Sequence, residues 1–266
     1  FLFKLWKQTD MIPYLIEIGP VKIPSYGFML MVAFMVDYYL LTKELKRLGK
    51  DPEMAGDAVF WAAIGGIVGS KIYYMAENFR AFSADPLGMI FSGSGLVFFG
   101  GLAGGMLAVT FYIKKKNEPW LAWADMVSPL LILGYAIGRI GCFLVGDDYG
   151  VVTDLPWGMT FPKGAPPTLV PVHPTQVYET VMGIGIFAIL WKLRTVPWPH
   201  GRRFALYLML AGTERLLIEF IRTNNEYFLG LSGAQIISIC MFIIGIALIN
   251  KLGKASHDDS AAGAET

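Results

Sequence analysis

The stretch Leu121–Leu144, LAWADMVSPLLILGYAIGRIGCFL, decides the fold of this chain, because it is an apolar run long enough to cross a lipid bilayer. Arg139 lies among glycines near the end of this run. A charged side chain at such a depth faces a helix-bundle interior or a wet cavity, and marks a functional site. A guanidinium there is suited to hold a phosphate or a carboxylate, so Arg139 is the first candidate functional residue.

Further apolar segments lie outward from this run in both directions. Hydrophobic residues make up 55% of the chain and charged residues only 16%, which leaves too little polar surface for a soluble globule of 266 residues. The expected spans are Tyr26–Thr42, Ala58–Ala76, Leu96–Ile113, Leu121–Leu144, Pro174–Trp191, Phe204–Ile221 and Ser232–Asn250. The sequence therefore predicts an all-α, polytopic membrane protein with seven transmembrane helices.

The basic residues between these spans are distributed unequally. One side collects Lys43, Lys46, Arg47, Lys50, Lys114, Lys115, Lys116, Lys192, Arg194, Arg202, Arg203, Lys251 and Lys254. The other side has only Lys4, Lys7, Lys22, Arg80, Lys163 and Arg222. The positive-inside rule then predicts an N-terminus outside and a C-terminus in the cytoplasm.

No linker or break in composition divides the chain, so we expect one membrane domain over residues 1–250. It would include an N-terminal interfacial arm (1–25) and an outer loop (146–172), which prolines hold in a stiff, non-helical path. The polar segment 251–266 predicts a disordered cytoplasmic tail. The two cysteines, Cys142 and Cys240, fall in different spans, so neither a disulfide nor a metal site is indicated. The net charge of +1 does not indicate a nucleic-acid partner.

Most polar residues of the spans fall in the outer half of the predicted topology. Arg215, Glu219 and Arg222 have helical spacing and share one helix face. This stripe is either an Arg215–Glu219 ion pair that stabilises the helix, or a second cation beside Arg139 in one outer-leaflet cavity. Asp37 and Asp125, nearer the cytoplasmic side, are expected to be satisfied by each other or by water.

Glycines recur at the small-xxx-small spacing that lets helix backbones approach closely in lipid. The pairs are Gly65 and Gly69, Gly100 and Gly104, Gly101 and Gly105, and Gly134 and Gly138. The glycines of the third span lie near its outer end, where a lipid headgroup could also approach bare backbone. Packing and headgroup contact both remain open for them.

Five segments carry most of these polar and glycine residues. They are IGPVKIPSYG (18–27), FFGGLAGG (98–105), GRIGCFLVGDDYG (138–150), HPTQVYE (173–179) and ERLLIEFIR (214–222). In order and spacing they resemble the prolipoprotein diacylglyceryl transferase family from end to end. The resemblance implies a multi-pass enzyme of the bacterial inner membrane with its active site toward the outer leaflet and the periplasm.

That family resemblance also implies a reaction. The diacylglyceryl group of phosphatidylglycerol would pass to the thiol of the lipobox cysteine of a prolipoprotein, forming a thioether and releasing glycerol phosphate. The implied partners are phosphatidylglycerol, the prolipoprotein peptide and the bilayer, and no metal or cofactor is required.

Matched position by position, the resemblance and the predicted topology give two groups of site residues. Catalytic roles are expected for Tyr26, Arg139, His173, Arg215 and Glu219. Substrate contacts are expected for Gly100, Gly101, Gly104, Cys142, Asp147, Gly150, Gln176, Tyr178, Glu179, Arg222 and Gln235. Arg139, together with Arg215 or Lys71, would stabilise the charge on the departing phosphate.

The chain departs from the family pattern at several positions. Phe99 replaces a histidine, Cys142 and Val145 replace two asparagines, Asp147 replaces a glutamate, and Ala211 replaces a tyrosine. Because Phe99 cannot accept the thiol proton, we expect His173 to be the base, with Asp147 or an already ionised thiol as alternatives. His173 could instead only anchor the start of its helix by a hydrogen bond. A covalent role for Cys142 is disfavoured, because a thioether is a poor leaving group.

Two other function classes stay open at this point. The first is a divergent paralogue that has lost or changed its chemistry, such as a lipid-binding protein or an enzyme for another thiol acceptor. The second is an unrelated seven-helix transporter or receptor. A transporter predicts inverted repeats and broken helices at the midplane, whereas the polar residues here cluster in one leaflet.

Overall fold

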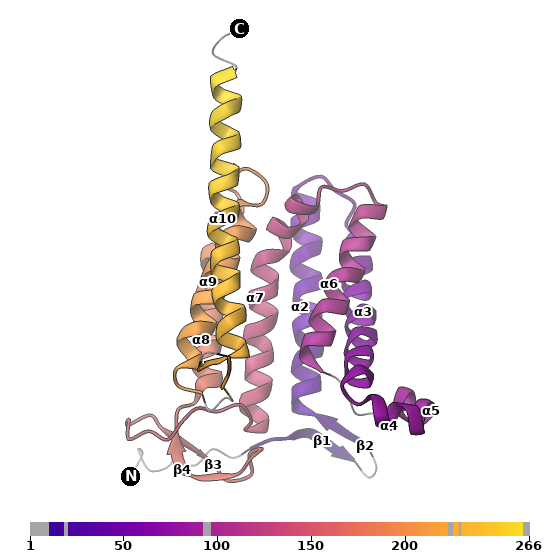
Figure 1. Cartoon of the computed structure of the whole chain (residues 1–266), viewed down its shortest axis with the longest axis vertical. Coiled ribbons are helices and arrows are strands. Elements are labelled where there is room, and N and C mark those ends of the chain that lie inside the picture. Colours follow the sequence, from indigo (N-terminus) through magenta and orange to yellow (C-terminus); the bar gives the residue numbers. More distant parts are fainter. Residues whose placement is uncertain (1–10, 19–20, 93–96, 223–225, 229, 263–266) are drawn as a thin grey trace. The chain divides into compact units, whose positions relative to one another are not determined.

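The computed structural model describes residues 11–18, 21–92, 97–222, 226–228 and 230–262. In this part the chain is mostly helical, with short β-hairpins between some helices (Figure 1). Every predicted span corresponds to a helix. The helices are α2 (Ser25–Arg47), α3 (Glu53–Glu77), α6 (Phe98–Lys115), α7 (Trp120–Val145), α8 (Thr175–Leu193), α9 (Arg202–Glu219) and α10 (Gly233–Ala262).

Four of these helices are long and apolar enough to cross a membrane. They are α2, α3, α7 and the Gly233–Gly253 part of α10. The fold is therefore that of a helical membrane protein. The helix α9 carries several charged residues within a short length, Glu214, Arg215 and Glu219 among them.

The structure adds elements that the periodicity did not predict. The hairpin of β1 (Tyr14–Ile18) and β2 (Val21–Pro24) occupies part of the expected N-terminal arm, whose residues 1–10 lie outside the described part. Two short helices follow α3, namely α4 (Phe79–Ala84) and α5 (Pro86–Phe91). The outer loop is non-helical as predicted, but contains the hairpin of β3 (Met159–Phe161) and β4 (Thr168–Val172). A last hairpin pairs β5 (Glu226–Phe228) with β6 (Leu231–Ser232).

The last helix extends beyond the expected end of its span. Disorder was predicted for residues 251–266, but α10 continues to Ala262. Helix formation is cooperative, so a long apolar helix propagates into an adjoining segment that contains good helix formers such as alanine and lysine. Residues 263–266 lie outside the described part.

The chain is grouped into two compact units. Unit 1 contains residues 1–37 and 124–266, and unit 2 contains residues 38–123. A single membrane domain was expected, because no linker is visible in the sequence. Both boundaries fall inside helices, one in α2 and one in α7, so neither a linker nor a change of composition marks them.

In unit 2, α3 packs against α6 through glycines, and the two helices lie along each other in Figure 1. A Cβ atom added at Gly104 would overlap the carbonyl oxygen of Gly65 and lie 2.8 Å from the Cα of Gly69. A Cβ atom at Gly69 would overlap the carbonyl oxygen of Gly100. The close helix approach predicted from the two small-xxx-small pairs is thus confirmed for these helices.

We expect Gly104→Ala to destabilise the protein, because the added methyl group must push two helix backbones apart. Overpacking of this kind costs about 1–3 kcal/mol. A lower midpoint of thermal unfolding in detergent would show the effect. The matched control is Gly66→Ala on α3, since a Cβ atom there would lie 3.6 Å from the nearest backbone oxygen, an ordinary contact. Equal midpoints for the two variants would contradict this account of the interface.

In unit 1, α7, α8 and α9 enclose an apolar core. Its buried residues are Ile132, Ile186, Leu190 and Ala211. The first part of α2 packs on α7, since a Cβ atom at Gly141 would lie 3.2 Å from the Cα of Tyr26. At Gly138 such an atom would meet nothing within 4 Å, so the second glycine of the 134–138 pair makes no close helix contact there.

Asp37 and Asp125 do not contact each other, although such a contact was one of the two expectations for these carboxylates. Asp125 accepts hydrogen bonds from the backbone N–H groups of Gly201 and Phe204, each at 2.7 Å. It thereby satisfies exposed amides at the N-terminus of α9. Asp37 instead faces α7, where its Oδ2 atom would lie 2.8 Å from a Cβ atom at Gly134. The predicted contact between the two carboxylates was wrong, because backbone amides at a helix end compete effectively for a buried carboxylate. Contact with water, the other expectation, stays a prediction for Asp37.

Candidate functional site

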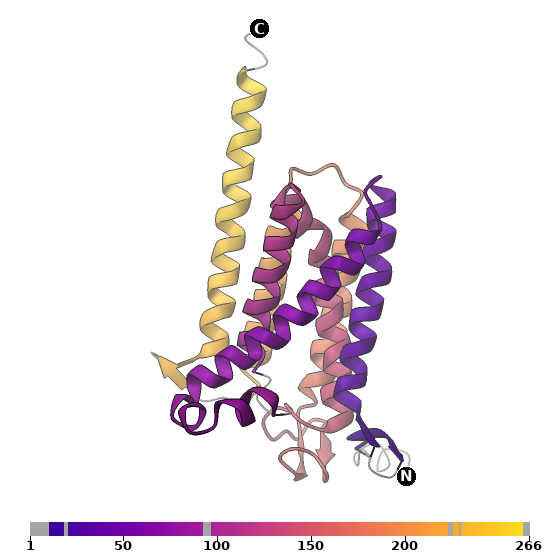
Figure 2. The same ribbon diagram turned by 90° about the vertical axis from the view of Figure 1, so that its right-hand side faces the viewer.

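Three arginines and three carboxylates of unit 1 form ion pairs where α7 ends, α8 begins and α9 ends. These three helix ends lie at one end of the unit (Figures 1 and 2). We call this group the arginine–carboxylate cluster, and its members are Arg139, Asp148, Glu179, Arg215, Glu219 and Arg222. Successive helices run in opposite directions, which brings residues far apart in the sequence to the same depth.

Glu179 is the centre of the cluster. Its side chain is fully buried, and its Oε1 atom lies 3.1 Å from Arg215 Nη1 and 3.4 Å from Arg139 Nε. Arg222 Nη1 lies 3.6 Å from the same oxygen. Tyr135 donates a hydrogen bond of 2.8 Å to it from α7. A buried carboxylate requires such compensation, and here one carboxylate fixes the relative positions of three guanidiniums.

Asp148 joins two of these arginines from the loop after α7. Its Oδ2 atom lies 2.8 Å from Arg139 Nη1 and its Oδ1 atom 2.7 Å from Arg222 Nη2. The backbone turns back at this point, with positive φ at Gly146 (77°) and Asp148 (60°). Burial alone would raise the pKa of Asp148, but Arg222 and Arg139 lower it below its ordinary value. These pairs therefore contribute stability at neutral pH that is lost only as the pH falls through the lowered pKa.

Side chains from the first turn of α8 hold the backbone of this loop. Thr175 donates a hydrogen bond of 2.7 Å to the carbonyl oxygen of Asp148, and Gln176 donates one to that of Asp147. Gly150 donates its N–H to the carbonyl oxygen of His173 at 2.8 Å. A Cβ atom at Gly150 would overlap the carbonyl oxygen of Ile221, so only glycine fits there. Gln176 and Gly150, expected at the substrate, thus build the frame of the cluster.

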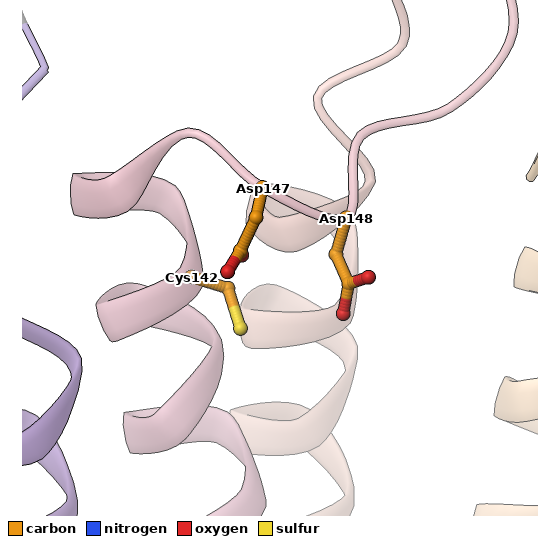
Figure 3. Close-up of side chains that lie close together, drawn as sticks. All are labelled: Cys142, Asp147 and Asp148. Carbon is orange, nitrogen blue, oxygen red and sulfur yellow. The ribbon is translucent and has the colours of Figure 1, made fainter. Parts of the chain in front are cut away.

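Cys142, Asp147 and Asp148 lie close together at the end of α7 and in the loop that follows it (Figure 3). One potential ligand atom from each falls within 4.8 Å of the others. Both oxygens of Asp148 already contact guanidiniums, and Arg139 Nη1 lies 3.9 Å from Cys142 Sγ. Arginines therefore supply the positive charge that a metal ion would bring. Burial raises the pKa of Asp147, and the charge of Asp148 raises it further, which makes Asp147 a stronger base than an ordinary aspartate.

His173 lies at the same end of unit 1, but its ring points to another partner. It is half-buried, and its Nδ1 atom lies 3.3 Å from the hydroxyl of Tyr178. That hydroxyl accepts a hydrogen bond of 2.7 Å from Trp157 Nε1. Among the described residues the imidazole makes no hydrogen bond or ion pair with the cluster. The structure thus brings together His173 and Tyr178, and places both beside the cluster rather than in it.

The remaining candidates are distributed more widely. Tyr26, which is 43% exposed, packs against α7 at Gly141, two residues after Arg139. Gln235 accepts a hydrogen bond of 2.9 Å from the N–H of Ser232, and Ser232 Oγ accepts one of 3.2 Å from the N–H of Gln235. This is a capping box at the start of α10. Gly100, Gly101 and Gly104 belong to unit 2 and pack against α3.

Three members of the site were not on the predicted list. Tyr135 lies one helical turn before Arg139 on the same face, a spacing that could have indicated it. Asp148 adjoins Asp147, and the sequence does not distinguish which of the two turns toward Arg139. Glu214 is buried on α9, 3.4 Å from the Tyr135 hydroxyl. The stripe of Arg215, Glu219 and Arg222 was predicted from helical spacing, and Glu214 does not share that spacing.

The chain is similar to proteins of a known family. The model of the family described as prolipoprotein diacylglyceryl transferase matches residues 13–251. A Vibrio atlanticus protein is 37% identical over 92% of both chains. A Pseudoalteromonas atlantica protein is 34% identical over 95% of both, and a Vibrio vulnificus protein is 36% identical over 92% of this chain and 93% of its own. Each of the three is named phosphatidylglycerol–prolipoprotein diacylglyceryl transferase.

Proposed function

The chain belongs to the prolipoprotein diacylglyceryl transferase family, and from this membership we propose that it transfers the diacylglyceryl group of phosphatidylglycerol to a prolipoprotein. The acceptor is the lipobox cysteine. Its sulfur forms a bond to the terminal glycerol carbon while the bond from that carbon to the phosphate oxygen breaks. The oxygen keeps the electron pair, glycerol phosphate leaves, and a base takes the thiol proton. The family match over nearly the whole chain is the observation on which this proposal depends.

The arginine–carboxylate cluster suits the charge changes of this reaction. Negative charge grows on the departing phosphate, and preorganised donors aimed at that charge stabilise the transition state. The side chains of Arg139 and Arg215 keep 15% and 23% of their surface exposed, which leaves them accessible to an anion. Asp148 is the most exposed member, at 42%. We infer that the phosphate takes the place of Asp148 against Arg139 and Arg222, while Glu179 holds the guanidiniums in position.

The proposal includes a location. All seven long helices cross the bacterial inner membrane, with the N-terminus outside and the C-terminus in the cytoplasm. The four strongly apolar helices and the unequal distribution of lysine and arginine support this topology. The cluster then lies in the outer half, where phosphatidylglycerol enters from the bilayer and the peptide from the periplasmic face.

The test uses the purified protein in detergent with phosphatidylglycerol and a lipobox peptide. We expect mass spectrometry to show a peptide that gains one diacylglyceryl group through a thioether, and no gain on a peptide with serine in place of the cysteine. Phe99, in place of the family's histidine, favours one alternative, a changed acceptor. Transfer to small thiols but not to the lipobox peptide would establish it. Lipid binding without any transfer would indicate a paralogue that has lost its chemistry.

His173→Gln tests the identity of the base. Glutamine keeps a hydrogen bond but cannot accept the thiol proton, so we expect the rate to fall about 10²-fold. His200→Gln is the matched control, because His200 is exposed and lies in the segment between α8 and α9. An unchanged rate for His173→Gln would assign proton removal to Asp147 or to thiol that is already ionised.

A further inference from the structure

Tyr135 connects the helices that form the arginine–carboxylate cluster, although no role was predicted for it from the sequence. Its hydroxyl donates a 2.8 Å hydrogen bond to Glu179 Oε1 on α8. The same hydroxyl oxygen lies 3.4 Å from Glu214 Oε1 on α9. A tyrosine hydroxyl has a single proton, so the shorter contact takes it. Tyr135 therefore directs its only proton to the carboxylate on which the three arginines converge.

The ring of Tyr135 contacts the cluster as well. The Arg139 guanidinium carbon lies 5.0 Å from the centre of the ring, within the range of a cation–π interaction. Tyr135 also packs against the apolar core that includes Ile132 and Ala211. One side chain thus supports both partners of the Arg139–Glu179 ion pair.

Tyr135 is the neutral donor to Glu179 Oε1 among the described residues. The other described groups that reach this oxygen are the guanidiniums of Arg139, Arg215 and Arg222, which the proposed reaction requires for the phosphate. A neutral donor holds the carboxylate without competing for the anionic substrate. The buried Glu179 would otherwise depend on the arginines alone for its orientation.

We propose that Tyr135 is a positioning residue of the transferase, which orients Glu179 by its hydroxyl and Arg139 by its ring. It does not touch the reacting atoms. The proposal rests on the proposed function, since it concerns the rate of that reaction. Through these two contacts Tyr135 keeps the three guanidiniums directed at the leaving phosphate.

The test compares Tyr135→Phe with Tyr207→Phe. Tyr207 packs against the same apolar core and stacks on Phe204, so its variant controls for the loss of a tyrosine hydroxyl between these helices. We expect Tyr135→Phe to lower kcat about 10- to 100-fold with KM within about twofold, the cost of a hydrogen bond to a charged group. Tyr135→Leu, which also removes the ring, is expected to lower kcat further. The Tyr207→Phe enzyme should keep the wild-type kcat.

A double-mutant cycle distinguishes positioning from a purely structural role. Glu179→Asp keeps the charge but withdraws the carboxylate from Tyr135 by one methylene group. In that background Tyr135→Phe should change kcat by less than about twofold, because the two residues act as a unit. Midpoints of thermal unfolding in detergent should agree between Tyr135→Phe and Tyr207→Phe.

Each outcome decides the proposal. Additive effects in the cycle, or a Tyr135→Phe enzyme with wild-type kcat, would overturn it. A loss of kcat that follows a loss of folded protein would show a structural role instead. If the wild-type protein does not transfer the diacylglyceryl group at all, the proposed function fails, and that result is visible before any variant is made.

Discussion

Replacement of Arg139 by lysine is expected to lower the transfer rate about 10²- to 10³-fold while the protein stays folded. Lysine keeps the positive charge but loses the planar fork. Arg139 uses that fork to reach Asp148 and Glu179 at the same time, and its guanidinium carbon lies 5.0 Å from the centre of the Tyr135 ring. A compact ammonium cannot make these contacts together, so the cation would no longer be aimed at the leaving phosphate.

The measurement is the initial rate of diacylglyceryl transfer at saturating phosphatidylglycerol, with the melting midpoint in detergent recorded in parallel. Arg80→Lys is the control, because Arg80 lies exposed on α4 in unit 2. It should match the wild type in both measurements. Near-normal turnover by Arg139→Lys would show that Arg139 serves packing and charge balance only.

Glu179→Gln is expected to have the second large effect, on both activity and stability. The substitution keeps the shape of the side chain but removes the charge that compensates three guanidiniums. Breaking a buried ion pair by removing one partner costs about 3–5 kcal/mol. We expect a lower unfolding midpoint and a transfer rate reduced about 10³-fold, because the arginines lose their common anchor.

Glu17→Gln is the control for Glu179→Gln. Glu17 is half-exposed and lies 3.8 Å from Lys22, also half-exposed, in the β1–β2 hairpin. A surface pair of this kind contributes about 0–1 kcal/mol, so its variant should differ little from the wild type. If Glu179→Gln unfolds and reacts like Glu17→Gln, the cluster is not organised around Glu179.

The sequence allowed the helices to be predicted because their signal is long and continuous. Apolar runs of about 20 residues give α2, α3, α7 and α10 directly. The hairpins escaped prediction because strands as short as Leu231–Ser232 have no detectable alternation. The end of α10 also escaped prediction, since cooperativity extends a helix beyond its apolar part.

Within the site, the residues that share one helix face could be predicted from their spacing in the sequence, but the ion pairs between helices could not. The stripe of Arg215, Glu219 and Arg222 follows from the helical period, and both interpretations of Arg215 have support in the structure. Arg215 pairs with Glu219 at 2.8 Å and also reaches Glu179, the carboxylate that Arg139 contacts. The central place of Glu179 depends on how α7, α8 and α9 meet, which no local pattern contains.

Gln235 makes a local hydrogen bond at the start of α10. Its side chain was assigned to substrate from its depth in the membrane, but it accepts a hydrogen bond from the backbone of Ser232. The capping-box pattern, a serine followed three residues later by glutamine, was present in the sequence. This local hydrogen bond could have been predicted for Gln235, whose expected depth in the membrane had suggested a contact with the substrate.

The helix α9 is held at both of its ends. Asp125 binds the amides of Gly201 and Phe204 at one end, while Arg215 pairs with Glu179 of α8 and Glu219 accepts a hydrogen bond from Ser232 at the other. Sliding the helix along its axis by a single residue, a rise of about 1.5 Å, would break contacts at both ends together. Axial movement is thereby excluded as a low-energy motion of α9. In the proposed reaction, where the phosphate takes the place of Asp148, only the side chain of Asp148 has to leave Arg139 and Arg222, and α9 keeps its position.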